Sequence, residues 1–130
     1  MVAVDTNVLV RLFAQDDAAQ GALAARLFQR EQVWIAKTVL VETAWVLKRL
    51  YGFTPQDITD ALQGLAGLSA VNLEDPVAVN QALSWLDAGV DFADGLHLAS
   101  CGEATSSPWC NALLAGPRES ARKAALRIAL

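Results

Sequence analysis

Short apolar runs alternate with longer amphipathic stretches along this chain of 130 residues. Apolar runs of three or four residues indicate buried strands, whereas apolar residues that recur every three or four positions indicate helices. The runs predict strands at residues 2–5, 33–36, 70–73 and 112–115. The amphipathic stretches predict helices at residues 6–13, 16–30, 39–51, from 54 onward, 76–87 and 92–104, and a basic helix after residue 117.

Residues with known preferences for helix ends mark several of these boundaries. Thr38 is expected to cap the helix over 39–51, and Gly52 is expected to end it. The next helix opens with Thr54 at its N-cap, Pro55 at its first position and Asp57 in its first turn. These signals support the alternation of strands with helices.

Strands that alternate with helices predict a parallel sheet that is covered by helices on both faces. The length fits a single domain over residues 1–130, and 54% hydrophobic residues suffice for a real core. No apolar stretch is long enough to suggest a membrane span. In such sheets, functional sites lie at the carboxyl ends of the strands.

The N-terminus and the cysteines favour a cytoplasmic protein. Asp5 and Asn7 stand where a signal peptide needs a basic start and a long apolar segment. Cys101 and Cys110 are too few for a disulfide scaffold and lack the spacing of metal ligands. We therefore expect reduced thiols and a cytoplasmic location.

The net charge of −4 argues against polyanion binding by the whole surface. It does not exclude a nuclease, because a carboxylate–metal site itself contributes negative residues. Basic residues gather near the end of the chain, at Arg118, Arg122, Lys123 and Arg127. They fit either phosphate contacts or a solvated helix face, and Arg11 and Arg118 are our candidates for RNA contact.

Asp5 ends the first apolar run, and a helical pattern begins directly after it. An acid at the tip of a strand is well placed for chemistry in an open α/β sheet. The same residue would also suit a simple helix cap. Thr6 and Asn7 follow it, and their hydroxyl and amide can hydrogen-bond Asp5 or a metal-bound water, or cap the helix.

Three further acids stand among apolar residues: Glu42, Asp91 and Asp94. Asp91 and Asp94 are three positions apart and share one helical face, where two like charges repel unless a cation or a proton intervenes. A divalent ion held by oxygen ligands resolves that conflict. Structural alternatives are an N-cap role for Asp91 and a solvent-facing position for Glu42.

Other reaction chemistries fit less well. The chain has no glycine-rich phosphate loop and no nucleophilic serine elbow, and His97, its single histidine, is better explained as a core or rim residue than as a ligand. A metal-dependent phosphatase of another α/β fold would want a second Asp two residues after Asp5, where Asn7 stands.

Three segments resemble the PIN-domain family, and more specifically the VapC-type ribonuclease toxins of type II toxin–antitoxin systems. The segments are AVDTNVLVR (residues 3–11), VETAWVL (41–47) and DFADGLHLA (91–99). The resemblance implies a three-layer α/β/α sandwich with a short parallel sheet. It also implies a Mg²⁺- or Mn²⁺-dependent endoribonuclease that commonly forms a homodimer and is inhibited by a cognate antitoxin protein.

The resemblance assigns roles by position. Asp5, Glu42 and Asp94 match the acidic catalytic residues of the family, and Asp91 matches an acid frequent in the toxin subgroup. Asp5, Asp94 and Asp91 would then be metal ligands. Thr6 and Asn7 match polar residues that support these ligands.

The chain departs from the family pattern after its last predicted strand. Pro117 stands where the family usually has another Asp, and Glu119 is the nearest acid after it. The alternative function is therefore a catalytically degraded PIN-like module that acts by binding RNA or protein.

Apolar residues of the N-terminal half are numerous for a small core. A groove for an antitoxin helix or an ordinary core would both explain them. The residues concerned are Leu9, Leu12, Phe13, Trp45, Leu47 and Leu50.

Overall fold

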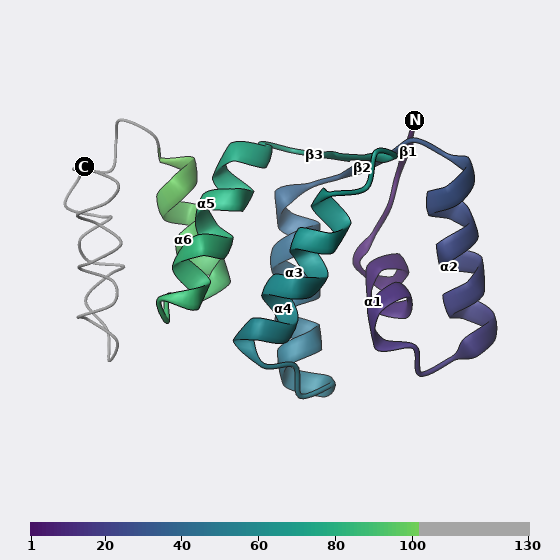
Figure 1. Cartoon of the computed structure of the whole chain (residues 1–130), viewed down its shortest axis with the longest axis horizontal. Coiled ribbons are helices and arrows are strands. Elements are labelled where there is room, and N and C mark those ends of the chain that lie inside the picture. Colours follow the sequence, from purple (N-terminus) through teal and green to yellow (C-terminus); the bar gives the residue numbers. More distant parts are fainter. Residues whose placement is uncertain (102–130) are drawn as a thin grey trace. The chain divides into compact units, whose positions relative to one another are not determined.

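The structure is a computed structural model, and it describes residues 1–101 (Figure 1). The chain divides into two compact units, of which the first spans Met1–Pro76 and the second begins at Val77. Each unit is described by itself below. The predicted strand at 112–115, the basic helix after 117, Cys110 and Arg118 lie outside the described residues.

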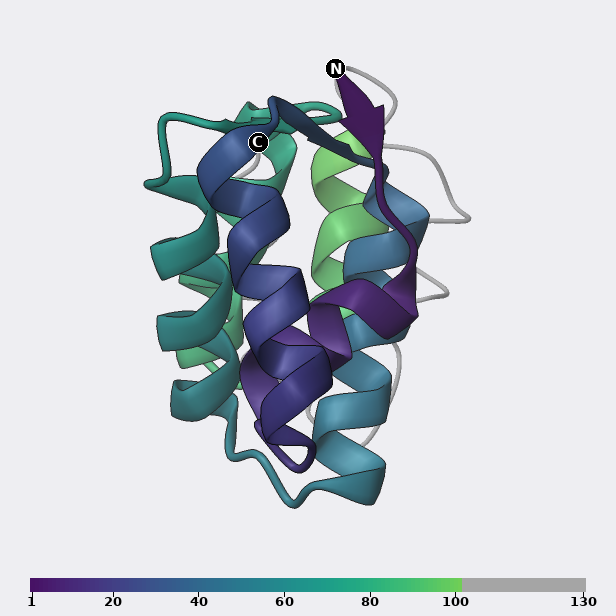
Figure 2. The same cartoon turned by 90° about the vertical axis from the view of Figure 1, so that its right-hand side faces the viewer.

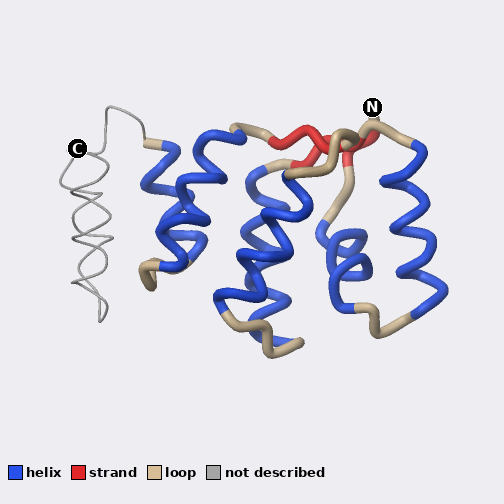
Figure 3. The backbone as a smooth tube through the Cα atoms, viewed as in Figure 1, coloured by secondary structure: helices blue, strands red, loops and turns tan. Residues whose placement is uncertain are grey.

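A parallel sheet of three strands organises the first unit (Figure 3). The strands are β1 (Val2–Ala3), β2 (Val33–Ile35) and β3 (Val71–Leu73), in the spatial order β1-β2-β3. Val33 of β2 lies opposite Val2 and Val71 of its neighbours. The predicted α/β class and parallel sheet are confirmed, with helices flanking the strands.

Two helices connect each pair of neighbouring strands. They are α1 (Thr6–Ala14), α2 (Ala18–Arg30), α3 (Lys37–Leu50) and α4 (Pro55–Ala66). Figure 2 shows α1 lying between α2 and α3 below the strands, and α1 packs against both helices. The first strand therefore leads directly into a helix that contacts α3, whose position decides where Glu42 lies.

The core of this unit follows the predicted periodicities. Val33 and Ile35 of β2 are fully buried, whereas Trp34 between them is exposed on the other face of the sheet. The buried side of α3 is formed by residues at helical spacing, namely Leu40, Thr43, Ala44 and Leu47. A fully buried leucine contributes roughly 1.5–3 kcal/mol of transfer free energy, so these faces fix the helix on the sheet.

Several element ends differ from the sequence prediction. Strand β1 ends at Ala3, although the amide of Val4 still donates to the carbonyl of Trp34. Helix α3 begins at Lys37, two residues earlier than predicted, and Ala36 is its N-cap in place of Thr38. Helix α2 begins at Ala18, two residues later than predicted, and Asp17 is its N-cap. The start of α4, with Thr54 as its N-cap, is confirmed.

The second unit contains α5 (Pro76–Asp87), which begins at the unit boundary, and α6 (Phe92–Ser100). Gly89 separates them with φ of +92°, a conformation that favours glycine. Trp85, Val90 and Leu98 form a buried cluster, and Gly95 of α6 lies against Ala82 of α5. The helix predicted over 92–104 ends at Ser100.

None of the helices in residues 1–101 is long and apolar enough to cross a membrane.

Candidate functional site

Asp5 lies just beyond β1 and is the N-cap of α1. Its Oδ1 accepts a hydrogen bond of 3.1 Å from the amide of Val8, so the structural role foreseen for it is confirmed. The side chain is exposed, and Oδ2 has no hydrogen-bond partner among the described residues. Capping therefore uses one oxygen of the carboxylate and leaves the other available to a ligand.

Thr6 joins the start of α1 to Glu42 of α3. The Thr6 hydroxyl donates a hydrogen bond of 2.8 Å to Oε2 of Glu42, across 36 positions of sequence. Thr6 is buried, which protects this bond from exchange with water. Its partner is Glu42 and not its neighbour Asp5. The bond thus attaches Glu42 to the residue that directly follows Asp5 in the chain.

Glu42 itself lies on the exposed side of α3. Its position follows from the helix, since Thr43 and Ala44 beside it belong to the buried face. Glu42 is exposed, as the solvent-facing alternative predicted. Its side chain is nevertheless held in place by the hydrogen bond from Thr6. Oε1 of Glu42 has no hydrogen-bond partner among the described residues. The two free oxygens, Oδ2 of Asp5 and Oε1 of Glu42, come from separate elements of one unit.

Such oxygens suit a hard divalent cation. Mg²⁺ binds carboxylate oxygens and keeps several of its water ligands, so one or two protein carboxylates can suffice for contact. Within residues 1–101, no group of three or more candidate ligand side chains lies together as a metal cluster. The first unit accordingly offers part of an oxygen donor set, and its chemistry fits Mg²⁺ or Mn²⁺.

The other two predicted acids belong to the second unit. Asp91 is the N-cap of α6, and its Oδ2 accepts a hydrogen bond of 3.2 Å from the amide of Ala93. Asp94 lies in the first turn of the same helix, where a negative charge is favoured by the helix dipole. Both side chains are half-buried. They share the start of one helix, as their spacing predicted.

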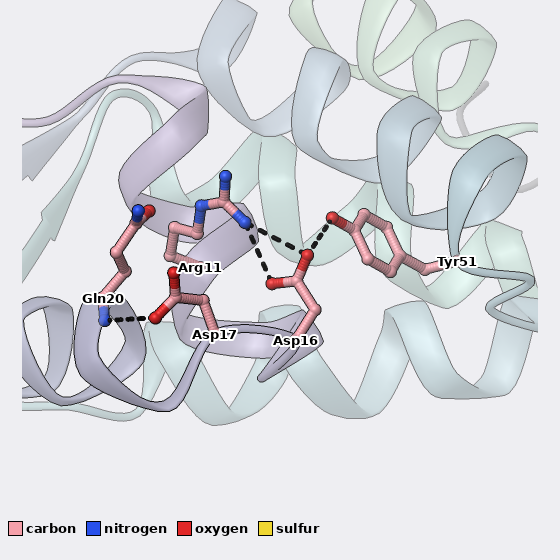
Figure 4. A network of polar contacts seen from close by, with 5 residues as sticks. All are labelled: Arg11, Asp16, Asp17, Gln20 and Tyr51. Carbon is pink, nitrogen blue, oxygen red and sulfur yellow. Dashed lines mark hydrogen bonds and ion pairs between the residues drawn. The ribbon is translucent and has the colours of Figure 1, made fainter.

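Arg11, a candidate for RNA contact, is engaged within the protein (Figure 4). Its Nη1 lies 3.0 Å from Oδ1 and 3.1 Å from Oδ2 of Asp16, while the hydroxyl of Tyr51 donates to Oδ2 at 2.8 Å. The Tyr51 hydrogen bond, aided by Arg11, holds the pKa of Asp16 below its ordinary value. Asp16 in turn raises the pKa of Tyr51. An RNA phosphate would have to compete with Asp16 for Arg11.

The remaining predicted residues have simpler surroundings. Asn7 is exposed and makes no hydrogen bond to a described residue, so its support of a ligand stays a prediction. His97 is exposed in the last turn of α6, and the half-buried thiol of Cys101 lies 3.1 Å from the carbonyl oxygen of His97, which accepts from it.

The six apolar residues considered for a groove differ in burial. Leu12 and Phe13 are half-buried. Leu9 and Leu47 are fully buried and belong to the core, so they cannot line a groove. Trp45 and Leu50 are 57% and 71% exposed on α3. The groove prediction is wrong for Leu9 and Leu47, which fit the alternative of an ordinary core. Trp45 and Leu50 remain exposed apolar side chains of α3.

Glu74 is a residue that the sequence interpretation did not single out. It follows β3, and its Oε2 accepts a hydrogen bond of 2.8 Å from the amide of Lys37 at the start of α3. Glu74 directly follows a predicted strand, and Asp5 ends one. An acid at the end of a predicted strand was therefore the signal that could have identified it.

Comparison with known proteins gives one clear result. The family model described as PIN domain matches residues 2–107 of the chain. No curated protein gives a significant match to the chain. No solved structure gives one either.

Proposed function

The chain belongs to the PIN domain family, whose members are generally metal-dependent nucleases, and from this premise we propose that it is a Mg²⁺- or Mn²⁺-dependent endoribonuclease. Its proposed biological role is that of the toxin in a type II toxin–antitoxin pair of the VapC type. The proposed catalytic residues are Asp5, Glu42 and Asp94, with Asp5, Asp94 and Asp91 as metal ligands.

The hydrogen bond from Thr6 to Glu42 is the observation that carries this proposal. It attaches Glu42 of α3 to the residue that follows the N-cap acid of α1, although the two helices are distant in sequence. Carboxylates that approach each other repel unless a cation or a proton intervenes. Binding of a divalent cation by both acids is the function that we infer for this attachment.

The reaction would be hydrolysis of an RNA phosphodiester bond. A bound Mg²⁺ or Mn²⁺ supplies a more acidic water and neutralises charge that develops on the phosphate oxygens. Glu42 or Asp5 would orient the attacking water and accept its proton. The Thr6 hydroxyl occupies Oε2 of Glu42, so Oε1 is the oxygen that would take this part. Thr6 would thereby fix the direction from which the water approaches.

Cleavage of a panel of structured RNAs tests the proposal. The purified chain would be incubated with Mg²⁺, Mn²⁺ or EDTA, beside the variants Asp5→Asn and Asp17→Asn. Asp17 is a matched control, because it caps α2 through a bond of 3.0 Å from Gln20, much as Asp5 caps α1. Asparagine is also a good N-cap, so both variants keep their helices.

Metal-dependent cuts that persist in Asp17→Asn and disappear in Asp5→Asn support the nuclease. Cuts that survive in Asp5→Asn, or in EDTA, contradict the proposed site. A folded protein that cuts none of the RNAs with either metal favours the alternative function.

That alternative is a PIN-like module with a degraded site that acts by binding RNA or protein. Its support is Pro117, which stands where the family usually has an acid and lies outside the described residues. The variant Pro117→Asp distinguishes the two functions. If this change creates cleavage in a chain that has none, the natural chain is a degenerate nuclease.

The proposed partners are RNA, a cognate antitoxin protein and a second copy of the chain, and the proposed location is the cytoplasm. Exposed Trp45 and Leu50 are the large apolar side chains of α3 that a protein partner would cover. RNA contacts by Arg11 and Arg118 remain part of this proposal. Light scattering of the purified chain tests the homodimer, which a well-behaved monomer would contradict.

A further inference from the structure

Helix α3 begins without a cap of its own. Its N-cap, Ala36, has no side-chain acceptor, and Thr38 lies inside the helix. The first amides of a helix lack partners within the helix and need acceptors from elsewhere. The start of α3 must therefore be stabilised by another part of the chain.

Glu74 supplies the missing acceptor from the neighbouring strand. Its Oε2 accepts from the amide of Lys37 at 2.8 Å, and its own amide donates to the carbonyl of Ile35 at 2.9 Å. The ends of β2 and β3 and the first residue of α3 are joined through this one residue. A carboxylate at this end of a helix also interacts favourably with the helix dipole.

A second contact ties the same two segments together. Nζ of Lys37 lies 3.5 Å from Oδ2 of Asp75, the residue that follows Glu74. The backbone and the side chain of Lys37 are thus both attached to the segment after β3. The start of α3 is fixed relative to the sheet at a half-buried position.

We propose that Glu74 is a positioning residue, which sets the place of Glu42 by capping α3 across the sheet. Glu42 lies five residues after Lys37, a rise of about 7.5 Å along the helix. A shift of the helix start is therefore transmitted to Glu42 and to its hydrogen bond with Thr6. For catalysis, this inference rests on the nuclease function proposed above.

Three variants separate positioning from general stability. Glu74→Ala removes the acceptor, whereas Glu74→Gln keeps a carbonyl oxygen that can accept from Lys37. Asp57→Ala is the control, because Asp57 accepts from the amide of Thr54 at 2.9 Å and caps α4, away from Glu42. RNA cleavage would be followed as kcat and KM, and folding by urea unfolding.

We expect Glu74→Ala to lower kcat about tenfold with little change in KM, as second-layer support residues generally do. Glu74→Gln should retain a kcat close to that of the wild type. Asp57→Ala should also keep the wild-type kcat, although its free energy of unfolding should fall about as much as that of Glu74→Ala. Equal kcat in Glu74→Ala and Asp57→Ala would overturn the inference.

A double-mutant cycle on stability tests the same inference without any cleavage. If Glu74 positions Glu42, then Glu74→Ala already weakens the bond to Thr6, and adding Thr6→Val should cost less than it does alone. We expect the unfolding constants to depart from additivity about twofold or more. Additive effects would refute the positioning role, and this arm decides the matter even if the wild-type chain cuts no RNA.

Discussion

The phenolic hydroxyl of Tyr51 donates a hydrogen bond of 2.8 Å to Oδ2 of Asp16, and so joins the end of α3 to the turn after α1. Thr6, at the start of α1, donates to Glu42 in the middle of α3. Helix α3 is therefore fixed at two points, to the start of α1 and to the turn that follows α1.

The Tyr51–Asp16 bond predicts a specific dependence of stability on pH. The pKa of Asp16 lies below its ordinary value of 3.8, chiefly because of the Tyr51 bond, so Asp16 stabilises the fold above that pH and loses this effect as the pH falls further. The pKa of Tyr51 is raised above 10.0 by Asp16, so its contribution is complete below pH 10 and is lost above it.

Tyr51→Phe should therefore lower the melting temperature only between about pH 4 and pH 10, and by no more than about 4 °C because the pair is exposed. Thermal melts of the wild type and the variant from acid to alkaline pH measure this. A difference that persists unchanged at pH 2 would show that packing, not the hydrogen bond, is responsible.

Thr6→Val should reduce cleavage far more than it reduces stability. Valine fits the buried site but cannot donate to Glu42, so the free energy of unfolding should fall by about 0.5–1.5 kcal/mol. Activity should fall about 10- to 100-fold, as expected for residues that orient catalytic groups. Thr6→Ser keeps the hydroxyl and should retain most activity; if serine and valine behave alike, the hydroxyl has no catalytic part.

Asp94→Asn should abolish metal-dependent cleavage and leave the chain folded. The change removes a charge from the first turn of α6 and should cost only about 0.3–1 kcal/mol through the helix dipole. Asp87→Asn, at the end of α5 in the same unit, is the matched control and should cut normally. Wild-type turnover by Asp94→Asn would exclude Asp94 from the mechanism.

Two glycines in helices should respond in opposite ways to alanine. At Gly21 of α2, a Cβ would lie 3.3 Å from the carbonyl oxygen of Arg11 in α1, whereas at Gly64 of α4 nothing lies within 4 Å. Gly64→Ala should stabilise the fold by about 0.5–1 kcal/mol through helix propensity.

Gly21→Ala should instead be less stable than Gly64→Ala by about 1–3 kcal/mol, because a helix backbone cannot yield as a side chain can. Urea unfolding of both variants measures the difference. Equal stabilisation would mean that α1 and α2 can separate slightly without cost.

Local signals predicted most of the fold. The capping box of Thr54 and Asp57 forms as expected, and each of the first three apolar runs forms a strand of the sheet. The predicted start of α3 was wrong because the acceptor for its first amide comes from Glu74, which is distant in sequence. No signal near Thr38 could reveal an acceptor that only the folded sheet brings into place.

The candidate site was predictable in its residues but not in their partners. The sequence identified Asp5, Thr6 and Glu42, yet the bond between Thr6 and Glu42 depends on how α1 packs against α3. Asp16 and Tyr51 entered the prediction only as helix ends, and the hydrogen bond between them was not foreseen. Contacts between separate helices are set by packing geometry, which a pattern along the chain does not contain.

The two-point attachment of α3 also constrains how this chain can vary in length. Inserting one residue between Glu42 and Tyr51 would turn the helix by about 100° and advance it by about 1.5 Å, so both contacts could not close together. Directly after Tyr51, exposed Gly52 with φ of +68° begins a turn that bears no such constraint. Insertions and deletions among relatives of this chain should thus be excluded from the helix and admitted only at the turn.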